Sequence, residues 1–407
     1  MTTFTLTDVA ADHYVETFDL TASDLGEVPS EPNHRVWSVR KRTLRGGRRD
    51  GVDRIVVDNG ALVVEILPTR GMSLWRGAFR GDRLGWDSPV VGGPIHPSFV
   101  RLEDRGGLGW LDGFDEWMVR CGLAHNGPPF EVSDPASPDP AAPPPRRTMH
   151  PLHGRIANTP AHFVTVHVEG NGPDQTITIE GRVSESSLFH PQLELTTRIT
   201  TTPGSNRLVV RDSITNRSDR PGDFQILYHW NFGPPYLGEG ATVYAPIETL
   251  TPRDPRAAEG IPTWATYEAP QPGFAEQAYY AHLIGTGPDQ ETLAMLLDPT
   301  RSKAVVLRFA RSELPCFTLW KNTGGPNDGY VTGLEPATNF PNPKAFEKAR
   351  GRVVPLEPGA VHEAETTLEI HDTPEAVATV LEEIVALEKS RLATIHLRPT
   401  EPFAPRK

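Results

Sequence analysis

Short runs of apolar residues, bounded by glycine, proline, asparagine and aspartate, recur along most of the chain. In several runs polar and apolar residues alternate, as in LELTTRITTT (193–202) and NRLVVRDSITN (206–216). Such alternation predicts strands with one buried and one solvent-facing side, as in antiparallel sheets. Further strand-like runs span 53–68, 162–170, 175–183, 223–230, 291–298 and 304–310. No segment of helical length separates consecutive runs, which argues against parallel β-α-β units.

One stretch near the end of the sequence has the pattern of a helix. Thr373 suits the N-cap and Pro374 the first turn. The residues that follow form an apolar stripe at helical spacing: Val377, Val380, Leu381, Ile384, Val385 and Leu387. Segment 109–123 predicts a short helix or an aromatic-rich loop, and segments 131–147 and about 251–278 are loop-like in composition.

These elements predict an all-β fold, one large antiparallel β-sandwich with a C-terminal helix. We expect the sandwich to span residues 51–372. Residues 1–50 would be an N-terminal extension packing on it, and residues 373–407 the C-terminal helix and tail.

Composition supports this fold and limits the function. The 41 prolines among 407 residues are roughly twice the usual share, which favours turns over long helices. A net charge of −12 disfavours nucleic-acid or anionic-membrane partners. The two cysteines, Cys121 and Cys316, are too few for a disulfide framework or a cysteine-based zinc site. The N-terminus lacks the pattern of a signal peptide and no run suits a membrane span, so we expect a cytoplasmic protein.

Three distant stretches carry the side chains that suit chemistry. In LYHWNFGPPY (227–236), His229 stands near the end of an apolar strand with Asn231 just beyond, and Gly-Pro-Pro cannot continue a ladder. In HPLHGRIANTPA (150–161), His153 precedes a glycine and Arg155. In GYVTGLEPATN (329–339), Glu335 ends a strand-like run. Each also has a plain structural interpretation: a core histidine, a surface loop and a solvated carboxylate.

Together the three stretches resemble the aldose-1-epimerase (galactose mutarotase) superfamily, and more closely an uncharacterised branch of it. The chain order His153, His229, Glu335 matches the family, and ILPTRGMSLWR (66–76) followed by GDRLGWDSP (81–89) resembles its early hairpin. The resemblance covers about residues 50 to 370. It implies a galactose mutarotase-like sandwich and a cofactor-free isomerase. Glu335 would be the base at the anomeric hydroxyl, His229 the acid at the ring oxygen, and His153 a ligand of the ring oxygen or a neighbouring hydroxyl.

The implied chemistry suits these groups. Opening a cyclic hemiacetal takes one proton from the anomeric hydroxyl and gives one to the ring oxygen, and a carboxylate and an imidazole suit these tasks when their pKa values are tuned. The expected partner is a small-molecule carbohydrate, bound by a monomer or homodimer without cofactor or metal. Candidate substrate-binding residues are Arg70, Arg155, Asn231, Trp320, Lys321 and Asp115, with Trp110 and Asn126 as further candidates for the wall of the cleft.

Departures from the family pattern leave other functions open. Family members have Pro-Tyr or Ser-Tyr after the second histidine and a glutamine soon after the glutamate, where this chain has Trp230-Asn231-Phe232-Gly233 and Pro336-Ala337-Thr338-Asn339. Their Asp-His-Asn segment has no counterpart, so galactose or glucose cannot be assumed as substrate. The alternatives are a non-catalytic carbohydrate-binding protein, a carbohydrate lyase or other isomerase, and a metal enzyme with His153, His229 and Glu335 as ligands.

Overall fold

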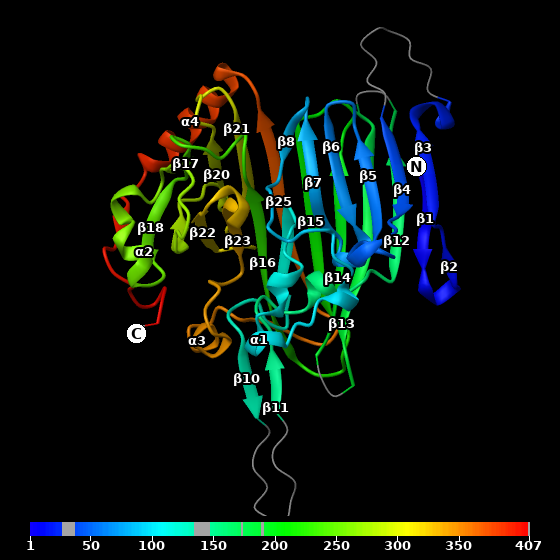
Figure 1. The fold of residues 1–407 in the computed structure, drawn as a ribbon, viewed down its shortest axis with the longest axis horizontal. Helices are drawn as coiled ribbons and strands as arrows, with labels where there is room; N and C mark the ends of the chain where they lie inside the picture. Colours follow the sequence, from blue (N-terminus) through cyan, green and yellow to red (C-terminus); the bar gives the residue numbers. More distant parts are fainter. Residues whose placement is uncertain (27–36, 134–146, 172–173, 189–190, 406–407) are drawn as a thin grey trace, which may run out of the picture.

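The computed structural model describes residues 1–26, 37–133, 147–171, 174–188 and 191–405. Over these residues the chain forms two large sheets that pack against each other as a sandwich (Figure 1). Neighbouring strands are antiparallel, except for one short parallel pair near the C-terminus. The predicted all-β sandwich is therefore confirmed.

The first sheet has ten strands among the described residues. In spatial order they are β17 (Thr242–Tyr244), β20 (Glu291–Leu297), β21 (Ala304–Ala310), β25 (Val361–His371), β15 (Arg207–Asn216), β14 (Gln192–Thr201), β13 (Thr176–Ser186), β12 (Phe163–Glu169), β1 (Thr2–Asp8) and β2 (His13–Tyr14).

The second sheet has fourteen strands over the same ranges. Its main path is β26 (Thr394–Ile395), β18 (Ile247–Pro252), β19 (Gln277–Leu283), β22 (Cys316–Thr323), β23 (Tyr330–Ala337), β16 (Gly222–Phe232), β9 (Met118–Leu123), β7 (Ser73–Phe79), β6 (Leu62–Leu67), β5 (Asp53–Asp58), β4 (Ser38–Thr43) and β3 (Thr17–Thr21). β24 (Val354–Leu356) pairs with β16, and β8 (Asp82–Leu84) with β7. A separate hairpin, β10 (Phe130–Ser133) and β11 (Arg147–His150), projects from one end of the sandwich (Figure 1).

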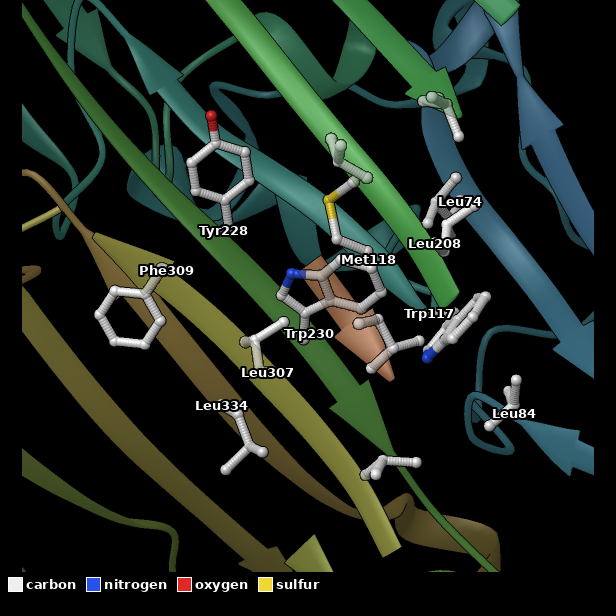
Figure 2. Close-up of a cluster of buried hydrophobic side chains, with 14 of the residues drawn as sticks. Leu74, Leu84, Trp117, Met118, Leu208, Tyr228, Trp230, Leu307, Phe309 and Leu334 are labelled. Carbon is white, nitrogen blue, oxygen red and sulfur yellow. The ribbon is translucent and has the colours of Figure 1, made fainter. Parts of the chain in front are cut away.

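The main core lies between the two sheets and determines which side chains face outward. Figure 2 shows part of it, where Tyr228 and Trp230 of β16 and Leu334 of β23 pack with apolar residues of the ten-stranded sheet. Because consecutive side chains of a strand point to opposite faces, His229 and Glu335 face away from this core. Both therefore lie on the outer face of the fourteen-stranded sheet.

A buried ion pair fixes β9 and β16 against the ten-stranded sheet. Arg120 of β9 is fully buried, and its Nη2 donates to Asp212 Oδ1 of β15 at 2.9 Å and to Thr197 Oγ1 of β14 at 2.7 Å. Tyr228 of β16 donates its hydroxyl to Asp212 Oδ2 at 2.9 Å. The strand that carries His229 is thereby tied to the opposite sheet one residue away from the imidazole.

The C-terminal helix α4 (Pro374–Glu388) lies where the sequence predicts it. The Thr373 hydroxyl accepts from the Ala376 amide at 3.3 Å, and Val377, Val380 and Ile384 are buried against the ten-stranded sheet. The predicted apolar stripe was too wide, since Val385 is 45% exposed. None of the helices in the described ranges has the length and apolarity that a membrane span requires.

Several predicted boundaries differ from the structure. Segment 109–123 forms one 3-10 turn, Gly109–Asp112, followed by a loop and β9. Segment 251–278 is not simply a loop, because it holds the end of β18, the short helix α2 (Pro255–Glu259) and the start of β19. In the predicted loop 131–147, residues 131–133 and 147 pair as strands, and residues 134–146 lie outside the described part of the chain. Both β16 and β23 run two residues further than predicted, to Phe232 and Ala337.

Candidate active site

A cavity of about 590 Å³ opens on the outer face of the fourteen-stranded sheet. This volume lies within the ~300–1,000 Å³ typical of small-molecule sites. Side chains of β16, β19, β22 and β23 form its floor, and loops around Trp110, Pro128, His153 and Pro341 form its walls. A second apolar cluster, separate from the main core, adjoins it: Trp110 and Phe114 belong to this cluster and line the cavity, and Val119, Cys121 and Leu227 extend it along β9 and β16.

Four polar side chains form a row across the cavity floor, which we call the polar row: Tyr280, Thr318, Glu335 and His229. Tyr280 of β19 pairs with Thr318 of β22, and Thr318 pairs with Glu335 of β23. On the next strand, β16, His229 Nε2 lies 3.1 Å from Glu335 Oε1. The four residues are 0–5% exposed and all line the cavity. Strand pairing thus brings together residues from four separate parts of the sequence.

Each member of the polar row has a buried polar atom without a hydrogen-bond partner among the described residues: Tyr280 Oη, Thr318 Oγ1, Glu335 Oε1 and His229 Nδ1. The 3.1 Å approach of His229 to Glu335 does not have hydrogen-bond geometry. A buried polar group without a partner costs about 1–3 kcal/mol, and most such groups in proteins are paired. The cavity floor therefore offers four hydrogen-bonding atoms that no described residue occupies.

His153 faces the same cavity from the loop after β11. Its Nδ1 donates to the Asn126 carbonyl oxygen at 2.8 Å, which leaves Nε2 of the neutral ring as an acceptor. Its ring centroid lies 5.9 Å from that of His229. The glycine that follows is required, because Gly154 has φ +75° and a Cβ there would lie 2.2 Å from the Gly122 carbonyl oxygen. The backbone conformation and the close approach to Gly122 thus explain why a glycine follows His153 in the sequence.

Burial shifts the proton affinities of the three candidate catalytic groups in opposite directions. It lowers the pKa of His229 to about 3, an effect that nearby His153 reinforces, and it also lowers the pKa of His153. It raises the pKa of Glu335 well above the usual value; the neighbouring Glu276 adds to this rise and Arg253 opposes it. Burial therefore favours the neutral forms of all three groups, a protonated carboxyl beside two neutral imidazoles.

Aromatic side chains enclose the polar row. The ring centroids of Phe114 and Trp320 lie 5.3 Å and 5.2 Å from that of His229, and Trp110 packs 4.7 Å from His153. Trp320 is held by a hydrogen bond from its Nε1 to Glu276 Oε2 at 2.6 Å. Flat apolar faces beside polar groups suit the two kinds of surface on a sugar ring.

Three predicted substrate-binding residues do not line the cavity and instead lie buried behind its wall. Arg70 donates to Glu116 Oε1 at 2.7 Å and to the Gly113 carbonyl at 3.0 Å. Asp115 accepts from Trp75 Nε1 at 3.0 Å; burial, with Glu116 close by, raises its pKa to about 7. Asn231 lies inside β16, not beyond it, and donates to the Glu116 carbonyl at 3.0 Å. Their contacts support the loop that carries Trp110 and Phe114.

Two further candidates point elsewhere. Arg155 pairs with Glu103 at 2.7 Å and lines a different cavity. Lys321 follows Trp320 on β22 and so faces the opposite side, where its Nζ donates to the carbonyls of Thr263 and Thr266 at 2.9 and 2.6 Å. Of the six substrate-binding candidates, Trp320 lines the cavity.

Sequence reasoning missed Phe114, Tyr280, Thr318, Arg253 and Glu276, which also line the cavity. A signal existed for Thr318, because in FTLWKN it is two residues from Trp320 and shares its face. Asn126, proposed for the wall, instead orients His153 through its carbonyl. Within the described ranges no group of three His, Cys, Asp or Glu side chains is arranged as metal ligands.

Comparisons with known proteins agree with this fold. The family described as "Domain of unknown function (DUF4432)" matches residues 49–370. A solved structure named "putative aldose 1-epimerase", from Klebsiella pneumoniae subsp. pneumoniae MGH 78578, is 33% identical over 100% of both chains, with a TM-score of 0.89. No curated protein matches the chain.

Two more distant structures share the fold. A galactose mutarotase-like protein from Clostridium acetobutylicum has 14% identity and a TM-score of 0.53, covering 82% of this chain and 98% of its own. A galactose mutarotase related enzyme from Lactobacillus acidophilus has 14% identity and a TM-score of 0.51, covering 79% and 98%. The chain belongs to the DUF4432 family, a branch of the aldose 1-epimerase (galactose mutarotase-like) superfamily.

Proposed function

We propose that this protein is a cofactor-free sugar mutarotase or epimerase that opens and closes the ring of a monosaccharide or derivative. The observation that carries the proposal is the Glu335–His229 pair at one end of the polar row. Glu335 Oε1 and His229 Nε2 lie 3.1 Å apart in a cavity of sugar-binding size, and each residue keeps a polar atom without a partner. Acid/base catalysis on a hydroxylated ligand needs such a pair.

Ring opening requires that the Glu335–His229 pair carries one transferable proton. As the base, Glu335 takes the proton of the anomeric hydroxyl; the bond between the anomeric carbon and the ring oxygen breaks, and His229 gives a proton to that oxygen. The aldehyde then rotates about its first carbon–carbon bond, and the reverse transfers close the ring as the other anomer. His153 Nε2 is an acceptor for a neighbouring hydroxyl. The net proton count is unchanged.

Burial favours the proton on Glu335, whereas ring opening by this route needs it on His229. Transfer within the pair interconverts the two forms once a bound sugar turns the two groups, whose nearest atoms lie 3.1 Å apart, into hydrogen-bond geometry. Sugar hydroxyls that donate to Glu335 stabilise its ionised form. Each acid or base role is typically worth 10²–10⁴-fold, so the two together lower the barrier by roughly 5–11 kcal/mol.

The test is anomer exchange in Glu335→Gln, followed by NMR on freshly dissolved neutral sugars. We expect the accelerated exchange to fall by at least about 100-fold while sugar binding is retained. The matched control is Glu185→Gln, since Glu185 is also a glutamate whose pKa burial raises, but it lies outside this cavity and accepts from the Leu123 and Ala124 amides. Full exchange in Glu335→Gln would refute the role of Glu335. Sugar binding by the wild type without accelerated exchange would instead identify a carbohydrate-binding protein.

A further inference from the structure

We propose that the substrate is an uncharged sugar and that Tyr280 and Thr318 together bind one of its hydroxyl groups. This inference rests on the proposed function and specifies the substrate class of the same site. Neither residue belongs to the acid/base pair. Their role is to orient the sugar relative to Glu335.

The two hydroxyls form one half of the polar row. Tyr280 and Thr318 face each other on β19 and β22 and are 0% and 2% exposed. Tyr280 Oη and Thr318 Oγ1 both lack a hydrogen-bond partner among the described residues, although the side chains line the cavity. Because each hydroxyl both donates and accepts, the two together suit a sugar hydroxyl, which does the same.

The position of the two hydroxyls sets the direction of the sugar ring. Thr318 pairs with Glu335 in the strand register, so Tyr280 lies one strand further from the reacting pair. A ring whose anomeric hydroxyl contacts Glu335 therefore extends toward β19 and presents another hydroxyl to Thr318 and Tyr280. Trp320, two residues from Thr318 on the same face of β22, lies beside this path.

The charges around the cavity argue for an uncharged ligand. Among the described residues that line it, Arg253 is the one permanent cation. Its Nε donates to Asp254 Oδ2 at 2.9 Å and its Nη2 to Glu276 Oε1 at 2.7 Å. Two carboxylates thus already neutralise this guanidinium. A phosphate or carboxylate on the sugar would lose its hydration here without gaining a free cation, which is unfavourable.

The experiment measures sugar binding through the change in intrinsic tryptophan fluorescence, for wild type, Tyr280→Phe and Thr318→Val. The probes are D-galactose, D-glucose, their monodeoxy analogues, galacturonate and glucose 6-phosphate. The matched control is Tyr236→Phe. Tyr236 Oη is also buried without a described partner, but it belongs to the main core and does not line the cavity.

We expect Tyr280→Phe and Thr318→Val each to weaken binding of a neutral sugar by about tenfold, as for one lost hydrogen bond. One monodeoxy analogue should bind the wild type as weakly as the parent sugar binds Tyr280→Phe. The same analogue should bind Tyr280→Phe no more weakly than it binds the wild type, because the hydroxyl that Tyr280 would contact is already absent. Tyr236→Phe should bind like the wild type. Since the Tyr280 hydroxyl has no partner among the described residues, Tyr280→Phe should not lower the melting temperature, whereas loss of a structural hydroxyl would lower it.

Three outcomes would overturn the inference: wild-type affinity of both variants for all neutral probes, tighter binding of galacturonate or glucose 6-phosphate than of the parent sugars, or no saturable binding of any neutral probe. The readout is separate from anomer exchange. A protein that binds neutral sugars through Tyr280 but does not accelerate exchange would refute the mutarotase function and leave this subsite intact.

Discussion

Gly333 stands beside the carboxyl group of Glu335 on the same face of β23, and a Cβ atom at Gly333 would lie 2.5 Å from Glu335 Oε1. The same atom would lie 3.0 Å from His229 Cε1. Because glycine has no side chain, Gly333 leaves room for the Glu335 carboxyl group and the His229 imidazole to approach each other. The backbone at Gly333 is not left-handed, so the need for glycine here is one of space and not of conformation.

Gly333→Ala should therefore separate Glu335 from His229 while the strand remains formed. We expect anomer exchange to fall at least about tenfold, because a displacement of about 1 Å in a catalytic pair already costs up to ~100-fold. NMR exchange measurements check the rate and circular dichroism the fold. Gly324→Ala is the matched control, since a Cβ there meets its nearest atom at 3.6 Å. Wild-type exchange in Gly333→Ala would mean that the close approach is not needed.

Glu335→Gln should stabilise the protein at neutral pH. The pKa of Glu335 is raised by burial, so between about 4.5 and the raised value the folded protein holds a proton that the unfolded chain has lost. Wild-type stability therefore falls as pH rises through this window, and the glutamine variant lacks this loss. Urea denaturation at pH 4.5 and pH 8 checks the prediction: the variant should gain stability relative to wild type only at the higher pH. Parallel pH dependence of the two proteins would contradict it.

Resemblance to the superfamily points to the three candidate catalytic residues, and local sequence determines the strand face or turn on which each of them lies. The two-residue period of β16 and β23 puts His229 and Glu335 on the face opposite Trp230 and Leu334, and the glycine after His153 reports a tight backbone contact. Tyr280 could not be found in this way. It reaches the site through the pairing of β19 with β22, whose register the sequence does not specify.

The substrate-binding candidates were chosen by residue type, and burial decided against most of them. Arg70 and Asp115 are charged groups, which are buried in a protein only when other groups pair with them. The sequence does not show that Glu116 pairs with Arg70 and that Trp75 donates to Asp115. For Lys321 the sequence alone is informative. It follows Trp320 on the same strand, and consecutive side chains of a strand point to opposite faces. Strand alternation therefore allows only one of Trp320 and Lys321 to face the cavity.

Asp212→Ala should severely destabilise the fold. The substitution leaves the buried Arg120 guanidinium without its carboxylate and the Tyr228 hydroxyl without its acceptor. Removing one partner of a buried ion pair costs about 3–5 kcal/mol, which guanidinium chloride denaturation measures. Glu365→Ala is the control, since Glu365 pairs with Arg211 on the exposed surface and such pairs contribute about 0–1 kcal/mol. Similar losses in both variants would show that the Arg120–Asp212 pair is no more important than a surface pair.

Arg70→Met tests whether Arg70 supports the wall of the cavity or contacts the sugar directly. In the structure it is 1% exposed and holds Glu116 and the Gly113 carbonyl, so its loss should lower stability by about 3–5 kcal/mol and loosen the loop that carries Trp110 and Phe114. Hydrogen exchange should then show faster exchange of the loop amides, and KM should rise. The double variant Arg70→Met/Glu116→Leu should recover much of the stability, because it no longer leaves an unpaired buried charge. If Arg70→Met instead lost sugar binding with unchanged stability and unchanged amide protection, Arg70 would have to contact the sugar, and its placement behind the wall would be wrong.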